Sequence, residues 1–391
     1  MLLLIIFTFR TGPSFRPDRS TPTLITQLLK PPLKHRRMSR NLFMILLLTS
    51  INFLPLARSL STLSTLSTLS PRLLDIAALA LSPPPNTPTT FLDVCSDHAL
   101  LPLHLSSSPS PFSTHIAIDI SHAATKDAQK TLERIPQSSL QTPITIMQGD
   151  GLLPFLPSSK KSEATAETFT TAISGVGVST ILSIIAPSTS YPSTFPTFVL
   201  SPTNTKATNL RKLLTTLLPP YTLSSIRLTK ELDRANKHRY YVALRFDHTP
   251  ATYSCYILQS EIQSYCGVTT DVTRRLNQHN GHLQGGAKAT RMNGPWKMGV
   301  VVTNFPDRSA AMKFEYAIKQ TSSFEARRHL ARQLAREHNR TFLDLAQTDP
   351  TTFILDAFEN VKTNDPTLLD EWAEFHRTWT RQDQTAQSSK Q

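Results

Sequence analysis

The chain has 391 residues, which is enough for two or three domains with cores of their own. Its net charge of +13 invites a nucleic-acid interpretation, but nine of the basic residues and only one acid fall in residues 1–70. Residues 251–320 hold eight basic and four acidic residues, and this local excess is compatible with a surface that contacts phosphate. The three cysteines form no CxxC pair, which excludes a disulfide framework and a cysteine-rich zinc site.

Residues 1–70 have the composition of a targeting leader. Three arginines precede an apolar run at 41–57, as in a signal peptide, and polar residues interrupt that run, which makes it marginal for a spanning helix. An acid-poor stretch rich in Ser, Thr and Leu follows, as in organelle transit peptides. The leader predicts delivery to a plastid, with the mitochondrion as second choice, and no membrane span in the mature chain. If translation starts at Met38 or Met44, the prediction becomes nucleus or cytoplasm.

Residues 71–247 alternate short β-rich runs with helical patterns, which indicates βαβ units and a largely parallel sheet. The expected strands are 91–96, 115–121, 144–151, 169–177, 197–201 and 240–246. The expected helices are 71–81, 122–134, 178–186 and 205–218. A loop rich in Ser and Lys interrupts the pattern at 157–168.

A second, smaller α/β unit is expected at 251–323. Its predicted strands are 253–260, 264–269 and 298–305, and its predicted helices are 272–279 and 308–320. The remaining residues, 324–391, have a helical pattern and form a helical C-terminal tail in this prediction.

The second unit holds a constellation of five residues suited to phosphodiester chemistry: Tyr256, Tyr265, Arg275, His279 and Glu315. Tyr256 and Tyr265 lie on adjacent short strands, and Gly267 is expected to permit a close turn. Arg275 and His279 are four residues apart on a helix and therefore share one face. Cleavage of a phosphodiester needs an activated water, charge neutralisation at the phosphate and help for the leaving oxygen.

These motifs resemble the GIY-YIG nuclease family. CYIL at 255–258 stands at the GIY position and YCG at 265–267 at the YIG position; GGAKATR and PWKMGVVVTNFPDRSAAMKFEYA follow. The segments GGAKATR and PWKMGVVVTNFPDRSAAMKFEYA are similar to the catalytic subunit of the eukaryotic nuclease that cuts branched DNA. The resemblance implies that Tyr256 or Tyr265 helps to activate water and that Arg275 holds the phosphate. It also implies His279 as a base or phosphate contact and Glu315 as the ligand of Mg²⁺ or Mn²⁺.

The constellation departs from the family pattern in two ways. Cys255 and Cys266 replace residues inside the two strand motifs. No cysteine follows Cys266, so the zinc-binding RING domain of the branched-DNA nuclease is not expected and no zinc is predicted. Specificity for branched DNA is therefore left open at this point.

The first unit resembles the bacterial tRNA adenine-22 N1-methyltransferases. FLDVCSDHALLPLHL at 91–105 is similar to the first motif of that family, and AIDIS, MQGDGL, AISGVGVSTIL and FVLSPTNTKATNLRKLL follow in the family's order. The resemblance implies a Rossmann-like fold that binds S-adenosylmethionine across the carboxyl ends of its strands. The implied cofactor-binding residues are Asp93, Asp97, His98, Asp119, Asp150, Gly175 and Gly177.

Several positions of this first unit differ from the family. Cys95 replaces a glycine of the first turn, and the other replacements are Val176, Val178, Ser201 and Thr203. The family's coiled-coil end, which serves tRNA, has no counterpart, and the second unit stands in its place. Retention of methyl transfer is therefore left open.

The combined expectation is an α/β protein with a Rossmann-like methyltransferase domain, a small GIY-YIG domain and a helical tail. We expect a metal-dependent endonuclease that hydrolyses phosphodiester bonds in DNA, in repair or recombination; whether that DNA is structured or branched is left open. The alternative is a tRNA methyltransferase that uses the GIY-YIG unit as a nucleic-acid-binding module. A third possibility is a binding protein in which both sites have decayed; the intact constellation argues against this for the second unit.

Overall fold

The computed structural model describes residues 69–82, 89–96, 98–157, 167–218, 221–233, 235–249 and 253–388. The predicted leader lies outside these residues apart from its last two positions, as does most of the predicted loop at 157–168. The described residues belong to one compact unit that begins at Thr65. Within them, no helix is both long enough and apolar enough to cross a membrane.

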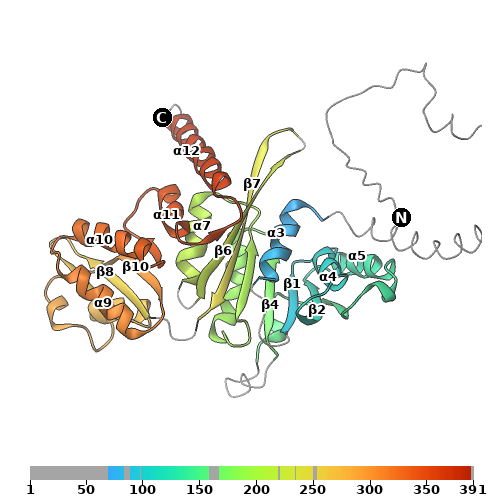
Figure 1. Cartoon of the computed structure of the whole chain (residues 1–391), viewed down its shortest axis with the longest axis horizontal. Coiled ribbons are helices and arrows are strands. Elements are labelled where there is room, and N and C mark those ends of the chain that lie inside the picture. The colour runs from blue at the N-terminus through green and yellow to red at the C-terminus, as the bar shows by residue number, and fades with distance from the viewer. Residues whose placement is uncertain are drawn as a thin grey trace, which may run out of the picture. The chain divides into compact units, whose positions relative to one another are not determined.

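A large twisted sheet organises the first domain (Figure 1). The strands of the domain are β1 (Thr89–Val94), β2 (Phe112–Asp119), β3 (Ile144–Gln148), β4 (Phe169–Ser174), β5 (Thr197–Ser201), β6 (Tyr221–Leu232) and β7 (His238–His248). Their order across the sheet is β6-β7-β5-β4-β1-β2-β3. Neighbours from β5 to β3 are parallel, while β7 is antiparallel to both β5 and β6. This is the largely parallel sheet that the sequence predicts, with β6 as an additional strand.

Two of the helices of the first domain begin at a serine cap. The helices of the domain are α3 (Pro71–Ala80), α4 (Leu100–Ser106), α5 (His122–Glu133), α6 (Val178–Ile185) and α7 (Ala207–Leu217). The Ser70 hydroxyl accepts a hydrogen bond from the Leu73 amide at the start of α3, and Ser121 caps α5 in the same way. The four predicted helices are confirmed to within two residues at each end, and α4 is an additional helix.

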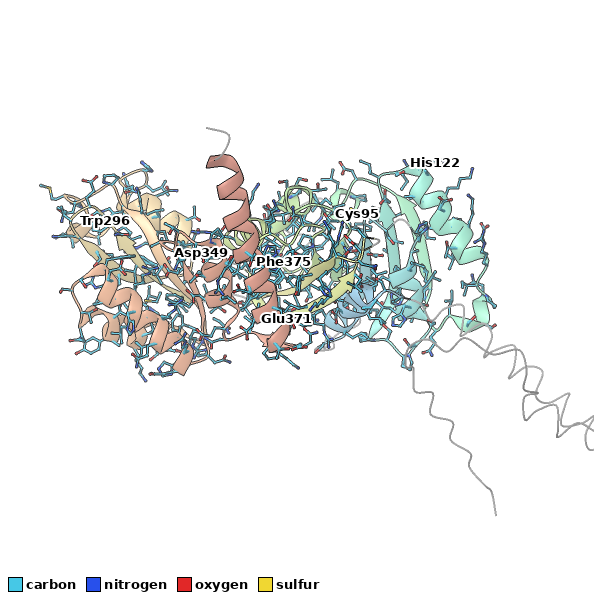
Figure 2. All side chains as sticks on the ribbon, turned by 90° about the horizontal axis from the view of Figure 1, so that it is seen from above. Cys95, His122, Trp296, Asp349, Glu371 and Phe375 are labelled. Atoms are coloured by element: carbon cyan, nitrogen blue, oxygen red, sulfur yellow. The ribbon has the colours of Figure 1, made fainter. Side chains whose placement is uncertain are left out.

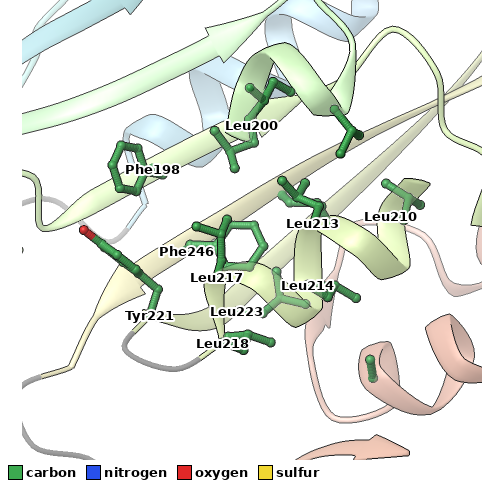
Figure 3. Close-up of a cluster of buried hydrophobic side chains, with 14 of the residues drawn as sticks. Phe198, Leu200, Leu210, Leu213, Leu214, Leu217, Leu218, Tyr221, Leu223 and Phe246 are labelled. Atoms are coloured by element: carbon green, nitrogen blue, oxygen red, sulfur yellow. The ribbon is translucent and has the colours of Figure 1, made fainter. Parts of the chain in front are cut away.

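The core of the first domain lies where α7 packs on the sheet (Figure 3). Leu210, Leu213, Leu214 and Leu217 recur at helical spacing and are all 0–1% exposed. They pack with Phe198 and other strand side chains in a single apolar cluster. Burial of this stripe holds α7 against the sheet.

The second domain is built on a smaller antiparallel sheet. Among the described residues its order is β11-β10-β8-β9. The strands are β8 (Tyr253–Gln259), β9 (Ser264–Thr269), β10 (Lys297–Phe305) and β11 (Thr341–Asp344), and the helices are α8 (Val272–His279), α9 (Arg308–Lys319) and α10 (Phe324–Glu337). Helix α9 packs on β8 and β9, and α10 packs beside it. All three predicted strands and both predicted helices are confirmed.

The C-terminal tail contains the predicted helices and two strands that the sequence did not indicate. Beyond α10 come β11, α11 (Pro350–Phe358), β12 (Lys362–Thr363) and α12 (Pro366–Ser388). Strand β11 pairs with β10, so the second sheet continues past the expected boundary at residue 323. Strand β12 returns to the first sheet and pairs with β6. Strands β11 and β12 have only four and two residues, so the sequence shows no alternating pattern by which they could be predicted.

The returning segment packs into the first domain (Figure 1). The Asn364 side chain accepts from the Leu228 amide at 2.8 Å and donates to the Leu228 carbonyl at 3.0 Å. Trp372 is fully buried, and its indole donates to the carbonyl of Thr205. Lys230 pairs with Glu371 on α12 at 2.6 Å, and Glu371 and Phe375 are labelled on this helix in Figure 2. In the sequence, the second sheet therefore lies between two segments of chain, and both of these segments contribute to the core of the first domain.

Candidate active site

Two tyrosines and one glycine define the sheet side of the site. In the antiparallel ladder of β8 and β9, Tyr256 faces Gly267 and Leu258 faces Tyr265. A Cβ atom on Gly267 would lie 2.4 Å from the Tyr256 hydroxyl oxygen. The prediction that Gly267 permits a turn is therefore wrong, because this residue lies inside β9. Its lack of a side chain leaves space for the Tyr256 ring.

Helix α8 brings two further side chains to the Tyr256 hydroxyl. Asp271 caps the helix by accepting from the Arg274 amide at 2.8 Å. One turn apart on the same face, Arg275 donates from Nε to the Tyr256 oxygen at 3.2 Å, and His279 Nε2 lies 2.8 Å from that oxygen. The shared face expected from the spacing of four residues is confirmed.

Burial controls the charge state of this cluster. Tyr256 is 0% exposed and His279 is 4% exposed. Burial raises the pKa of Tyr256 well above its ordinary value, although the Arg275 hydrogen bond and charge oppose the change. Burial and then the Arg275 charge lower the pKa of His279 to about 4. At neutral pH the site therefore holds a protonated phenol, a neutral imidazole and a guanidinium cation.

A pocket of about 450 Å³ opens over these residues. Its walls include Tyr256, Tyr265, Arg275 and Glu315, together with Arg308 of α9. Tyr256 forms the buried floor, while Tyr265 and Arg275 are half-buried walls. The structure thus gathers four of the five sequence-predicted residues on one pocket.

His279 lies behind Tyr256 rather than on the wall of this pocket. Its ring nitrogens contact the Tyr256 hydroxyl and the Thr290 hydroxyl, each at 2.8 Å. Of the two roles expected for His279, this position favours a base that acts through Tyr256 over a direct phosphate contact. The sequence did not single out Thr290, although this residue lies inside the GGAKATR motif at 285–291.

Glu315 supplies the acidic side of the pocket. Helix α9 begins after Asp307, which accepts from the Ala310 amide, and carries Glu315 on its third turn. The Glu315 carboxylate pairs with Lys319 at 2.9 Å and its side chain is 16% exposed. Over the described residues, no three His, Cys, Asp or Glu side chains gather as a metal cage. A lone carboxylate beside an open pocket fits Mg²⁺ or Mn²⁺, which bind through one or two carboxylates and retain several waters.

The loop after α8 is held to the helix by a short series of contacts. The Asn280 side chain donates to the Trp296 carbonyl and accepts from the Trp296 amide. The Trp296 indole donates to the Thr290 carbonyl at 2.8 Å; Trp296 is labelled in Figure 2. A Cβ on Gly286 would lie 2.3 Å from the Gln278 carbonyl, so only glycine allows this approach. The loop is thereby fixed against the end of α8.

The first domain gathers a separate set of residues at the carboxyl ends of its parallel strands. Asp93 is buried in β1, and Asp119 ends β2 with one carboxylate oxygen accepting from the Ser121 amide at 2.7 Å. Asp150 and Gly175 follow β3 and β4, and Gly177 caps α6. His98 is exposed in the loop after β1, and Asp97 lies outside the described residues.

The space at this edge of the sheet fits S-adenosylmethionine at Gly175 and Gly177, while Cys95 stands where the resembled family has a glycine. The space where a side chain would stand on Gly175 or Gly177 has no atom within 4 Å, which leaves room for a ligand. Cys95 adopts the left-handed region at φ 63°, a conformation that costs a non-glycine residue about 1–2 kcal/mol. Burial and the nearby Asp119 and Asp93 raise the pKa of the Cys95 thiol to about 11, so it stays protonated.

Comparison with known proteins identifies both domains. Residues 69–240 match the family model described as a methyltransferase domain. Residues 252–328 match the family model described as a GIY-YIG catalytic domain.

Curated relatives match the second domain. "Structure-specific endonuclease subunit slx1" of Pyrenophora tritici-repentis is 47% identical over 89 residues, which are 22% of this chain and 24% of that protein. The "Structure-specific endonuclease subunit SLX1 homolog" of Cryptosporidium parvum is 48% identical over 66 residues, 16% of each chain. The match with these two relatives thus spans a quarter of their length or less.

Solved structures align with this chain at low sequence identity. The M1A22 tRNA methyltransferase TrmK of B. subtilis is 17% identical, with a TM-score of 0.34, over 80% of this chain and 98% of that chain. The TrmK of M. capricolum, solved with S-adenosyl-homocysteine, is 21% identical, with a TM-score of 0.34, over 46% and 69% of the two chains.

Proposed function

We propose that this chain, in which a methyltransferase domain is followed by a GIY-YIG domain, is a metal-dependent endonuclease that hydrolyses phosphodiester bonds in DNA. One observation carries the proposal. The Tyr256 hydroxyl contacts both His279 Nε2 and Arg275 Nε, on a pocket that Glu315 also lines. The relatives that match this domain are named structure-specific endonuclease subunits, which supports endonuclease activity.

The proposed reaction begins with proton transfer through Tyr256. As a water oxygen bonds to phosphorus, its proton passes to the Tyr256 oxygen and the Tyr256 proton passes to His279 Nε2. The bond from phosphorus to the leaving oxygen then breaks, and that oxygen takes a proton from solvent. His279 returns its proton to solvent after product release. The neutral imidazole at physiological pH is the state that can accept this proton.

Arg275 has two tasks in this scheme. Its guanidinium covers the Tyr256 hydroxyl in the structure described here and is half-buried at the pocket wall. A bound phosphate would draw the guanidinium toward the pocket, which neutralises phosphate charge and gives water access to the hydroxyl. The same phosphate charge offsets the Arg275 charge that depresses the pKa of His279.

Glu315 would hold the divalent ion at the opposite wall. A bound Mg²⁺ or Mn²⁺ supplies charge neutralisation at the phosphate and at the leaving oxygen. Glu315 must exchange its present partner Lys319 for the ion, a change that its partial exposure allows. The basic residues of this domain, eight against four acids over 251–320, supply the wider attraction for a polyanion.

A substrate panel tests the proposal. The whole chain is incubated with branched DNA, duplex DNA and tRNA in Mg²⁺, beside Arg275→Ala and the matched variant Arg274→Ala. Arg274 is the exposed neighbour of Arg275 on α8, so its loss removes an equal charge outside the pocket. We expect DNA cleavage that Arg275→Ala abolishes and Arg274→Ala largely retains. A folded wild type that cuts none of the three, or only tRNA, contradicts the proposal.

Methyl transfer from S-adenosylmethionine to tRNA is the second candidate function, located in the first domain. The match over 69–240 favours it, as do the open space at Gly175 and Gly177 and the Asp119 carboxylate at the end of β2. Calorimetric titration with S-adenosylmethionine tests cofactor binding. Binding that Asp119→Ala weakens at least tenfold supports this function, while no heat of binding to the wild type contradicts it.

A further inference from the structure

The Thr290 hydroxyl lies between two groups that compete for it. Its oxygen is 2.8 Å from the Ala287 carbonyl oxygen and 2.8 Å from His279 Nδ1. Thr290 is 1% exposed and His279 is 4% exposed, so water does not take either contact. The orientation of this one hydroxyl determines where the imidazole carries its proton.

A hydroxyl has a single hydrogen, and a carbonyl oxygen can only accept. The contact with Ala287 therefore requires the Thr290 hydroxyl to donate to that carbonyl. The Thr290 oxygen must then accept from His279, which requires the His279 proton to be on Nδ1. In the opposite arrangement Thr290 would donate to Nδ1 and lose its hydroxyl bond to the Ala287 carbonyl, which would still accept from the Thr290 amide at 3.1 Å; the lost bond costs about 0.5–1.5 kcal/mol.

The tautomer decides the direction of the next bond in the series. With the proton on Nδ1, Nε2 presents a lone pair to the Tyr256 hydroxyl at 2.8 Å. Tyr256 then donates to Nε2 and accepts from Arg275 Nε. With the proton on Nε2, two donors would meet at the Tyr256 oxygen and the phenol proton would have no acceptor on His279.

We infer that Thr290 is a positioning residue that holds His279 in the Nδ1-protonated tautomer and so provides the lone pair that receives the Tyr256 proton. This inference rests on the proposed nuclease function for its catalytic consequence, but the tautomer itself does not depend on it. When Nε2 accepts the proton, His279 becomes an imidazolium with both nitrogens protonated. Thr290 continues to accept from Nδ1 throughout, so the step requires no rearrangement behind the ring.

The backbone around Thr290 is fixed well enough to serve this purpose. Thr290 ends a short 3₁₀ turn, Lys288–Thr290, and its carbonyl accepts from the Trp296 indole. Asn280 at the end of α8 holds the Trp296 backbone by two hydrogen bonds. Helix α8 thus carries His279 and also positions, through Trp296, the residue that orients it.

Two substitutions at Thr290 and one elsewhere test the inference. Thr290→Val keeps the shape and removes the hydroxyl, while Thr290→Ser keeps the hydroxyl and removes a methyl group. Thr303→Val is the matched control, because Thr303 is 2% exposed in β10 and its hydroxyl has no hydrogen-bond partner among the residues described. Thermal melting of all three confirms that each is folded before it is compared.

The first readout is the His279 tautomer, measured from imidazole ¹⁵N chemical shifts and assigned with His279→Gln. We expect Nδ1 protonation in the wild type, Thr290→Ser and Thr303→Val, and a mixed or reversed tautomer in Thr290→Val. The second readout is steady-state cleavage of DNA, which gives kcat and KM. We expect kcat to fall about 10- to 100-fold in Thr290→Val with KM changed less than about twofold, and Thr290→Ser to recover most of that loss.

Three results would overturn the inference: a wild type without the Nδ1-protonated tautomer, a wild-type tautomer in Thr290→Val, or a loss of kcat that Thr290→Ser shares in full. If the wild type cleaves no nucleic acid but Thr290→Val shifts the tautomer, the nuclease proposal fails and the assignment of the tautomer stands. If the wild type cleaves DNA but His279 is not protonated on Nδ1, the nuclease proposal stands and the inference about Thr290 fails.

Discussion

Gly267→Ala should damage the site without replacing any proposed catalytic residue. The added Cβ would lie 2.4 Å from the Tyr256 oxygen and 2.7 Å from the adjacent ring carbon. Tyr256 must move until the contact exceeds at least 3.0 Å, a displacement of 0.6 Å or more. The ring is fully buried and its hydroxyl already bonds His279 and Arg275, so it cannot move that far and keep both bonds. We expect about a 100-fold loss of kcat from the displacement and about 1–3 kcal/mol of stability from overpacking.

Steady-state DNA cleavage measures the loss of kcat, and denaturant unfolding measures the loss of stability. Gly299→Ala is the matched control in the same sheet, since its Cβ would lie 2.5 Å from the Phe324 ring and does not approach Tyr256. We expect Gly299→Ala to lose stability by a similar amount while the folded fraction retains its kcat. If Gly267→Ala cleaves at the wild-type rate, or if Gly299→Ala loses as much kcat, the reasoning about the Tyr256 position is refuted.

Two further predictions concern the first domain. Trp372→Ala should destabilise that domain by about 3–5 kcal/mol in denaturant unfolding, because a fully buried indole is removed; a change below 1 kcal/mol would show that the C-terminal segment is not part of its core. His115 is fully buried between Phe91 and Phe112, and burial lowers its pKa from 6.5 to about 4. Below pH 6.5 His115 binds a proton in the unfolded chain, whereas in the folded chain it stays neutral down to about pH 4. The free energy of unfolding therefore falls by up to about 3 kcal/mol as the pH drops from 6.5 to 4. His115→Leu should remove this part of the pH dependence, and an unchanged slope of stability against pH between 6.5 and 4 would contradict the assignment.

Local patterns in the sequence were sufficient to predict that Tyr256, Arg275 and His279 lie together. The four-residue spacing of Arg275 and His279 determines a shared helix face whatever the surrounding fold. The tyrosines lie nine residues apart on two strands joined by a short turn, so their proximity also follows from local structure. Helix 272–279 was predicted with the bounds that the structure shows, since Asp271 is a strong capping residue.

Contacts between distant residues explain what the sequence did not reveal. Trp372 bonds a carbonyl 167 residues away, and Asn364 pairs with a backbone 136 residues away. No periodic pattern encodes such pairs, so the tail was predicted as helical without its link to the first sheet. Gly267 was assigned to a turn for the same reason, because its true constraint is a ring on the neighbouring strand.

Thr290 illustrates a further limit of sequence reasoning. A threonine in a loop is usually a solvated or capping residue, and no spacing rule connects it to His279 eleven positions earlier. Only the fold shows that its hydroxyl is buried between a carbonyl and an imidazole. The role of such a residue becomes visible once hydrogen-bond donors and acceptors are counted in three dimensions.

The Mg²⁺ dependence of DNA cleavage by the wild type and by Glu315→Gln tests the central claim most directly. Glu325→Gln is the matched control, because Glu325 is an exposed acid of the same domain on α10, outside the pocket. We predict that wild type and Glu325→Gln cleave with a saturable dependence on Mg²⁺ and stop when it is chelated, and that Glu315→Gln loses at least about 100-fold in rate. Cleavage by Glu315→Gln at the wild-type rate, or equal wild-type cleavage without a divalent ion, would contradict the account.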